Sequence, residues 1–181
     1  MKIKSLPISG AFEIELVDFK DSRGTFKRLF CSKELNNLIP SKQIVQINSS
    51  ETFQKGSIRG MHFQTKPKAE TKLIHCISGE VFDVMIDLRK SSKTFLQWHS
   101  VKLSSHLNNM VIIPDGCAHG FQVLSENSRL IYFHTEFYSP EYESGIRYDD
   151  PLIGIDWPLE IDFVSDRDKK HQLLTESFKG I

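Results

Sequence analysis

Two histidines stand beside residues that could place them in a reactive site. His62 lies within the apolar stretch Arg-Gly-Met-His-Phe-Gln at residues 59–64, and His119 follows a Pro-Asp-Gly turn at residues 114–116 by three positions. An imidazole can transfer protons near neutral pH or bind a metal ion. A metal site would gain from a second imidazole two residues after His62, but that position is Gln64, a poor substitute. The residues therefore predict a site built for proton transfer without a metal.

Alternating apolar and polar residues predict that β-strands hold this site. Residues 11–17 read Ala-Phe-Glu-Ile-Glu-Leu-Val, in which every second side chain is apolar, as in a half-buried strand. Similar reasoning predicts further strands at residues 44–48, 72–77, 81–88, 95–103, 110–113, 121–124 and 129–134. Short turns separate these segments. Many short strands at this spacing favour a sandwich or barrel over β-α-β units.

Helical patterns are short. They cover residues 32–38 and 165–174, and Ser165 is a suitable N-cap for the second. No repeat, low-complexity tract or linker marks a second domain, so residues 1–181 are expected to form one domain. The predicted fold is all-β: a jelly-roll barrel, or double-stranded β-helix, with short helices near both ends.

The two-residue period of a strand shows which side chains share a face. On one predicted strand Lys72 shares its face with Ile74, and on another Tyr132 shares its face with Leu130. If the barrel interior receives Lys72, Tyr132 and His62, it holds a cation, an acid and a base. A lysine is costly to bury unless it is paired or binds an anion, so its presence in an apolar run is informative.

Composition argues against several classes of function. Hydrophobic residues make up 39% of the chain and charged residues 25%, which is ordinary for a globular protein. The formal net charge is zero, so no overall field would attract nucleic acid or an anionic membrane. The N-terminus lacks the apolar stretch of a signal peptide, and no apolar run approaches the roughly 20 residues needed to span a bilayer. Three separated cysteines, Cys31, Cys76 and Cys117, suit a reducing cytoplasm, as buried side chains or free thiols.

Ten short motifs together resemble one enzyme family. They include Asp-Ser-Arg-Gly, Gln-Ile-Asn, Lys-Leu, Ile-Tyr and Ile-Asp-Trp-Pro, and they lie at residues 21–24, 46–48, 59–64, 72–73, 79–84, 113–121, 131–132, 138–141, 149–151 and 155–158. In this order they resemble the dTDP-4-dehydrorhamnose 3,5-epimerases and related enzymes of nucleotide-linked 4-keto-6-deoxy sugars. The resemblance covers nearly the whole chain and implies the cupin fold for the predicted barrel.

The resemblance also implies a mechanism. Inverting a carbon next to a ketone needs a base on one face and an acid on the other. A donor or cation must stabilise the enolate oxygen between the two steps. By resemblance, His62 is the base and Asp168 orients it. Tyr132 is the acid on the opposite face, and Lys72 stabilises the enolate.

Further residues are implied to bind the ligand. Arg23 and Arg59 would bind the diphosphate, because a guanidinium group forks onto phosphate oxygens. The other implied contacts are Arg28, Gln46, Asn48, His119, Glu143 and Arg167. The resemblance implies no cofactor and no metal. It also implies a homodimer in which the N-terminal strand region lies against the partner barrel and helps to complete its ligand site.

One departure from the family pattern concerns the nucleotide. Arg28 stands where family members commonly have a glutamate that reaches the base. Arginine has five donors and no acceptor, so Arg28 would suit the acceptor edges of cytosine or guanine in a CDP- or GDP-linked sugar. If Arg28 instead points to solvent or to a phosphate, the base would be held mainly by stacking on Phe19 or Phe26. Both interpretations stay open.

Three functions stay open as well. The first is a 3,5-epimerase of a nucleotide-diphosphate 4-keto sugar that serves cell-surface polysaccharide biosynthesis. The second is a relative that inverts only carbon 3 or carbon 5. The third is a sugar-binding or metal-dependent cupin without epimerase activity; the missing His-x-His pair argues against its metal form, and the intact set of His62, Tyr132 and Lys72 argues against a binding module.

One assignment has a rival interpretation, and five histidines have no assignment. Asp168 lies in a charge-rich segment at residues 166–170, where a solvated helix face is the rival. The remaining histidines have no motif support and are expected to be structural or on the surface: His75, His99, His106, His134 and His171.

Overall fold

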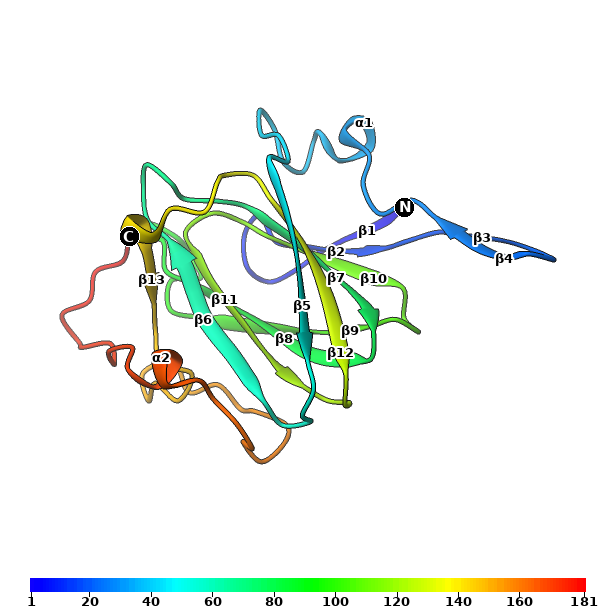
Figure 1. The fold of residues 1–181 in the computed structure, drawn as a ribbon. Coiled ribbons are helices and arrows are strands. Elements are labelled where there is room, and N and C mark those ends of the chain that lie inside the picture. The colour runs from blue at the N-terminus through cyan, green and yellow to red at the C-terminus, as the bar shows by residue number, and fades with distance from the viewer.

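The computed structural model describes residues 1–181, and its regular structure is almost entirely antiparallel β-strand (Figure 1). The strands are β1 (Lys2–Ser5), β2 (Phe12–Glu15), β3 (Asp18–Asp21), β4 (Gly24–Lys27), β5 (Gln46–Thr52), β6 (Ile58–Gln64), β7 (Lys72–Ser78), β8 (Glu80–Asp87), β9 (Trp98–Ser104), β10 (Asn109–Ile113), β11 (Cys117–Val123), β12 (Ser128–His134) and β13 (Glu143–Gly145). One sheet has the order β1-β2-β10-β7-β12-β5, and the other has the order β13-β6-β11-β8-β9. The predicted all-β architecture is confirmed.

All eight predicted strands are present, and the boundaries of three differ most from the prediction. β9 starts at Trp98 instead of residue 95, because Leu96 adopts a positive φ of 62° within a turn. β5 covers 46–52 instead of 44–48, since pairing with β12 extends it through polar residues that carry no strand pattern. β11 starts at Cys117 rather than residue 121, because all seven of its residues are buried and leave no alternation to detect.

The remaining differences are short elements. β1, β3, β4 and β13 were not predicted, and β6 was recognised only as a strand-like run around His62. The helices are α1 (Ser32–Leu35) and α2 (Asp166–Lys169), both shorter than predicted, and η1 (Pro140–Tyr142) is a single 3₁₀ turn. The Ser165 N-cap is confirmed, since its Oγ accepts a hydrogen bond from the Asp168 N–H at 3.1 Å. Neither helix has the length or apolar character needed to cross a membrane.

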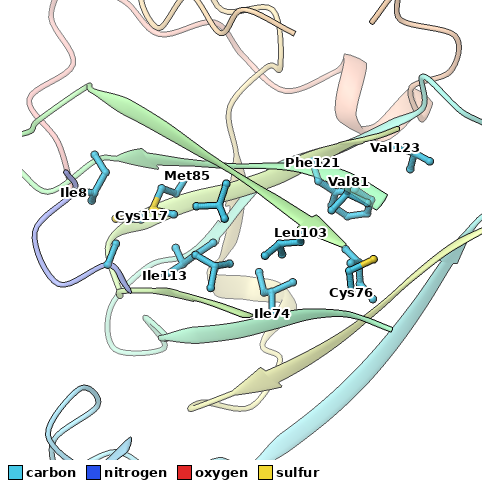
Figure 2. Close-up of a cluster of buried hydrophobic side chains, with 14 residues drawn as sticks. Ile8, Ile74, Cys76, Val81, Met85, Leu103, Ile113, Cys117, Phe121 and Val123 are labelled. Atoms are coloured by element: carbon cyan, nitrogen blue, oxygen red, sulfur yellow. The ribbon is translucent and has the colours of Figure 1, made fainter. Parts of the chain in front are cut away.

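Apolar side chains from both sheets fill the space between them (Figure 2). Ile74 and Cys76 lie in this cluster, whereas Leu73 packs in a separate cluster with α1 on the other face of its sheet. The two-residue period therefore predicted the inward face of β7 correctly, including the face that carries Lys72. Cys76 and Cys117 are buried free thiols, and burial raises their pKa values to about 11 and about 12.

The β3–β4 hairpin projects away from the barrel (Figure 1). Its two phenylalanines, Phe19 and Phe26, are 61% and 68% exposed and contact each other at a centroid distance of 6.3 Å. Arg23 at the hairpin turn bonds Asp21 at 2.6 Å, while its side chain stays 88% exposed. Exposed aromatic and basic side chains on a projecting arm are typical of a surface that contacts something else.

Candidate active site

A cavity of about 470 Å³ opens among strands of both sheets. Eight of the twelve expected site residues line it: Asn48, Arg59, His62, Lys72, His119, Tyr132, Arg167 and Asp168. His62 and His119 come from β6 and β11 of the five-stranded sheet, while Lys72 and Tyr132 come from β7 and β12 of the six-stranded sheet. The fold thus gathers residues that are more than a hundred positions apart in the chain around one space.

His62 forms a close pair with Asp168. His62 Nε2 lies 2.7 Å from Asp168 Oδ1, and the aspartate side chain is only 5% exposed. Burial opposes ionisation of Asp168, but the hydrogen bonds from His62 and the Gly60 N–H outweigh it and lower the pKa of that carboxyl. An ionised carboxylate only accepts hydrogen bonds, so Nε2 is the protonated ring nitrogen. Nδ1 therefore keeps the lone pair that a general base needs.

The C-terminal segment reaches His62 because it is fastened to the start of β6. Val164 pairs with Ile58 in a parallel bridge, and the Ile58 N–H donates to the Phe163 carbonyl at 2.8 Å. The helix α2 begins directly afterwards and turns Asp168 toward the barrel. Asp168 is therefore buried beside His62, and the rival interpretation of a solvated helix face is wrong for this residue.

Gly60 supports the same pair through the backbone. Its N–H donates to Asp168 Oδ2 at 3.2 Å, so both carboxylate oxygens have partners. Gly60 has a φ of 132°, and a Cβ there would lie 2.5 Å from the Cα of Gly120 on β11. A side chain at residue 60 would push β6 and β11 apart where His62 and His119 are directly opposite each other.

Tyr132 stands on the other sheet with its hydroxyl placed by Ser50. The two oxygens are 2.9 Å apart, and the ring contacts the His119 and His134 rings at centroid distances of 6.3 and 6.1 Å. Burial raises the pKa of the Tyr132 phenol, so the hydroxyl is protonated at neutral pH. A protonated phenol facing the same cavity as the His62 imidazole is suited to act as the acid.

Lys72 is buried, and a carboxylate partner offsets the cost of burying its charge. Its Nζ lies 3.3 Å from Glu70 Oε1, with side chains 12% and 7% exposed. The other oxygen of Glu70 lies 2.7 Å from His134 Nδ1. Burial opposes ionisation of Glu70, but His134 and Lys72 lower the pKa of its carboxyl. His134, expected to be structural or on the surface, instead lines the cavity, because it shares the inward face of β12 with Tyr132.

His119 has a buried partner that sequence reasoning missed. Its Nε2 lies 2.8 Å from Asp83 Oδ2, and Asp83 on β8 is completely buried with Oδ1 unpartnered. Burial raises the pKa of the Asp83 carboxyl. Asp83 lies within a predicted strand, and Glu70 lies just before another. Both could have been sought from the sequence, because a buried lysine or imidazole needs a carboxylate partner.

Four expected ligand residues do not line the cavity. Arg23 lies on the projecting hairpin, and Arg28 pairs with Glu34 at 2.5 Å near α1. Gln46 accepts a hydrogen bond from the Tyr138 N–H at 3.1 Å. Glu143 holds the cavity residue Arg167 at 2.5 Å and accepts from the Tyr138 hydroxyl at 2.7 Å. In the single chain these four residues therefore lie outside the cavity, and their expected contacts with the ligand stay predictions.

Arg59 presents a cation at the cavity. Its Nε donates to Thr52 Oγ1 at 2.9 Å and one terminal nitrogen donates to the Glu51 carbonyl at 3.3 Å. These bonds fix the plane of the guanidinium group without neutralising it, since neither partner is charged. The cavity therefore combines an imidazole paired with a carboxylate, a protonated phenol and three cationic side chains, a set suited to proton transfer on an anionic ligand.

Comparisons with known proteins agree with one another. The family model for dTDP-4-dehydrorhamnose 3,5-epimerase matches residues 5–176. The enzyme of that name from Methanothermobacter thermautotrophicus is 42% identical over 173 residues, which cover 94% of this chain and 92% of the relative.

Two crystal structures of similar proteins carry ligands. The Bacillus anthracis dTDP-4-dehydrorhamnose 3,5-epimerase, with TDP and PPi bound, superposes with a TM-score of 0.91 at 38% identity, covering 96% of this chain and 99% of that one. The Legionella pneumophila dTDP-6-deoxy-D-glucose-3,5-epimerase, in complex with dTDP-4-keto-L-rhamnose, gives a TM-score of 0.90 at 39% identity and covers 95% and 92%.

Proposed function

The chain belongs to the dTDP-4-dehydrorhamnose 3,5-epimerase family, and we propose that it inverts carbons 3 and 5 of a dTDP-linked 4-keto-6-deoxy sugar by proton transfer through an enolate. It is a sugar-nucleotide epimerase with the cupin fold of its relatives. The observation that carries the mechanism is the placement of the His62–Asp168 pair and Tyr132 on opposite sheets around one cavity. Two functions are set aside: inversion of a single carbon, and sugar binding without catalysis.

The proposed reaction begins at the base. His62 Nδ1 removes the proton from a carbon next to the 4-keto group, and Asp168 stabilises the resulting imidazolium through the 2.7 Å hydrogen bond. The electron pair of the broken C–H bond moves onto the carbonyl oxygen to form the enolate. Lys72 stabilises that negative charge, and Glu70 holds the ammonium group in place.

The reaction finishes from the opposite face. Tyr132 donates its phenolic proton to the same carbon, and the carbonyl is restored with inverted configuration. Each inversion leaves one extra proton on His62 and removes one from Tyr132. Both groups must therefore exchange protons with solvent before the second carbon reacts, which the open cavity permits.

Reaction products test this function. The enzyme is incubated with dTDP-4-keto-6-deoxyglucose, and the sugar is then reduced with borohydride, released by hydrolysis and separated by chromatography. Inversion at both carbons gives rhamnose and its C4 epimer. Recovery of only 6-deoxyglucose and its C4 epimer would contradict the proposed activity, and a sugar inverted at one centre would favour the single-carbon alternative.

Activity is expected to survive EDTA. The proposed base, acid and cation supply every proton and charge that the reaction needs, so no Lewis acid takes part. The check is turnover before and after dialysis against the chelator, with metal content measured by plasma emission. Lost activity that returns on adding zinc, manganese or iron would show that the metal-free mechanism is wrong.

The same proposal includes a homodimer in which each chain completes the site of its partner. The supporting feature is the β3–β4 hairpin, which carries Arg23 away from its own cavity and exposes Phe19 and Phe26. In a symmetric dimer, a projecting arm that leaves its own barrel can lie against the other barrel. Arg23 would then bind the diphosphate in the partner site, opposite Arg59.

Mixing two inactive variants tests this exchange. Arg23→Ala removes the arm's cation, and His62→Asn removes the base. In a mixed dimer, one of the two sites receives an intact arm and an intact base, so random reassociation should restore roughly a quarter of wild-type activity. Mixtures that remain as inactive as the separate variants, or a monomer at micromolar concentration with full activity, would rule out the shared site.

Arg28 is expected to have little influence on the nucleotide. Its guanidinium is paired with Glu34 of the same chain, so it is not free to read cytosine or guanine. Calorimetry with dTDP, UDP, CDP and GDP should show tightest binding of dTDP, and Arg28→Ala should change that affinity by less than about tenfold. Tighter binding of CDP or GDP that Arg28→Ala abolishes would support the opposite assignment.

Two further expectations concern the compartment and the pathway of the enzyme. The odd number of separated free thiols suits a reducing compartment, so we expect the enzyme in the cytoplasm. Its product, a deoxysugar nucleotide, would serve cell-surface polysaccharide biosynthesis.

A further inference from the structure

A second imidazole lies against the His62–Asp168 pair. The ring of His171 meets the His62 ring edge-on at a centroid distance of 5.6 Å. Its Nε2 is 3.8 Å from Asp168 Oδ1, the same oxygen that accepts from His62. That nitrogen is buried and has no hydrogen-bond partner. His171 was expected to be structural or on the surface, yet it directs an unused nitrogen at the catalytic carboxylate.

Gly145 explains how His171 reaches this position. Gly145 on β13 is the cross-strand neighbour of His62 on β6. A Cβ at residue 145 would lie 2.4, 2.5 and 2.6 Å from three atoms of the His171 ring, including Nε2. The missing side chain therefore leaves the slot into which the imidazole fits beside His62. The backbone of β13 holds the ring from one side, and the His62 ring borders it on another.

The three side chains have the composition of a transition-metal site. One ligand atom from each of His62, Asp168 and His171 lies within 4.8 Å of the other two. Ligands about 2.1 Å from a tetrahedral zinc are about 3.4 Å apart. The observed separations of 2.7 and 3.8 Å from the shared Asp168 oxygen bracket this value. Two imidazoles and one carboxylate suit Zn²⁺, Co²⁺ and similar cations rather than Mg²⁺ or Ca²⁺.

We propose that His62, Asp168 and His171 form an inhibitory site for Zn²⁺ and related divalent cations. The cation replaces the proton on His62 Nε2, and the neutral imidazole then carries its one proton on Nδ1. Nδ1 is the nitrogen whose lone pair would abstract the substrate proton, so the metal-bound base is inactive. No group is oxidised or reduced, and the proton only moves from one ring nitrogen to the other.

The inhibitory consequence rests on the proposed function, whereas the binding itself does not. His171 does not line the ligand cavity, so the cation would be held behind the base and not in the space of the sugar. Inhibition should therefore lower kcat more than it raises KM. EDTA should restore activity, which distinguishes this site from a metal that the reaction requires.

Cobalt absorption tests the site without any substrate. Titrating the EDTA-treated protein with Co²⁺ should produce visible bands that saturate at one ion per chain and that Zn²⁺ removes. In His171→Ala, the Co²⁺ concentration at half-saturation should rise by on the order of 100-fold, since a direct ligand matters at least as much as the groups that orient it. Absent bands in the wild type, or equal titrations of wild type and variant, would overturn the proposal.

Inhibition of turnover by Zn²⁺ is the second measurement. Each protein is compared with its own metal-free activity, so any effect of a substitution on the basal rate cancels. Zn²⁺ should inhibit the wild type and His106→Gln, whose histidine is exposed on another part of the barrel, but should inhibit His171→Ala and His171→Gln far less. Zinc bound to the diphosphate of the substrate would act equally on all four proteins and would count against the site.

Gly145→Ala provides a variant that keeps all three ligands. The added methyl group occupies space filled by the His171 ring, so the imidazole must leave its observed position. We expect weakened Co²⁺ binding, as in His171→Ala. Unchanged Co²⁺ affinity in this variant would show that the slot at Gly145 does not place His171, and would overturn this placement.

If cobalt binds as described but no dTDP-sugar is converted, the proposed function fails and the metal site stands.

Discussion

His62→Asn is expected to lower kcat by about 10³-fold or more, because general acid–base groups contribute roughly 10²–10⁴. Asparagine nearly matches the shape of the ring near the backbone, so the barrel should fold normally. Binding of dTDP should change little, since Arg59 does not depend on His62. Steady-state kinetics and calorimetry with dTDP measure the two effects separately.

The matched control for this substitution is His106→Asn. His106 is exposed and has no contact with the cavity, so its replacement should leave kcat and dTDP affinity unchanged. A His62→Asn enzyme with near-normal turnover would require another base. A loss of dTDP binding equal to the loss of turnover would indicate that His62 holds the nucleotide rather than removing a proton.

Tyr132→Phe is expected to lower formation of the inverted product by about 10²–10³-fold through a different step. The substitution keeps the ring that packs on His119 and His134 and removes only the hydroxyl that meets Ser50. His62 can still remove the substrate proton and return it to the same face. The variant should therefore exchange protons with solvent at carbon 3 or 5 faster than it forms product, and rapid-quench analysis beside NMR measures both rates.

Ser50→Ala separates the acid from its support. This variant keeps the phenol and loses only the 2.9 Å contact that orients it, so product formation should fall by about tenfold or less. An equal loss in Ser50→Ala and Tyr132→Phe would mean that the hydroxyl acts through its hydrogen bond and not as a proton donor. Equal rates of exchange and product formation in Tyr132→Phe would assign the acid to another residue.

The sequence predicted the inward faces of the strands because alternation is a local property. Lys72 and Tyr132 are correctly placed by counting every second residue along β7 and β12. Asp168 could not be placed in this way, because the residues around it are charged and resemble a solvated helix. Its burial depends on the bridge between Val164 and Ile58, a contact across more than a hundred residues that carries no local pattern.

The carboxylates that pair with Lys72 and His119 could not be placed from the sequence either. Glu70 and Asp83 look like ordinary polar positions in the sequence, and only strand register brings them to Lys72 and His119. His171 was overlooked for a related reason: its slot exists because Gly145 is opposite His62, which cannot be known before β13 is paired with β6. Long-range register therefore determined what sequence reasoning missed.

Arg23 illustrates a different limit. The motif around it is recognisable, and its assignment to the diphosphate follows from resemblance. Within a single chain, however, the hairpin carries Arg23 away from the cavity, so its proposed role at the diphosphate depends on the proposed homodimer.

Deuterium incorporation at carbons 3 and 5 of the sugar shows whether His62 removes the proton from each carbon. The enzyme is incubated with dTDP-4-keto-6-deoxyglucose in D₂O, and proton NMR follows the signals of the hydrogens on both carbons over time. We expect deuterium at both positions with the wild type and at neither with His62→Asn. Exchange at only one carbon in the wild type, or exchange at a normal rate without His62, would contradict this expectation.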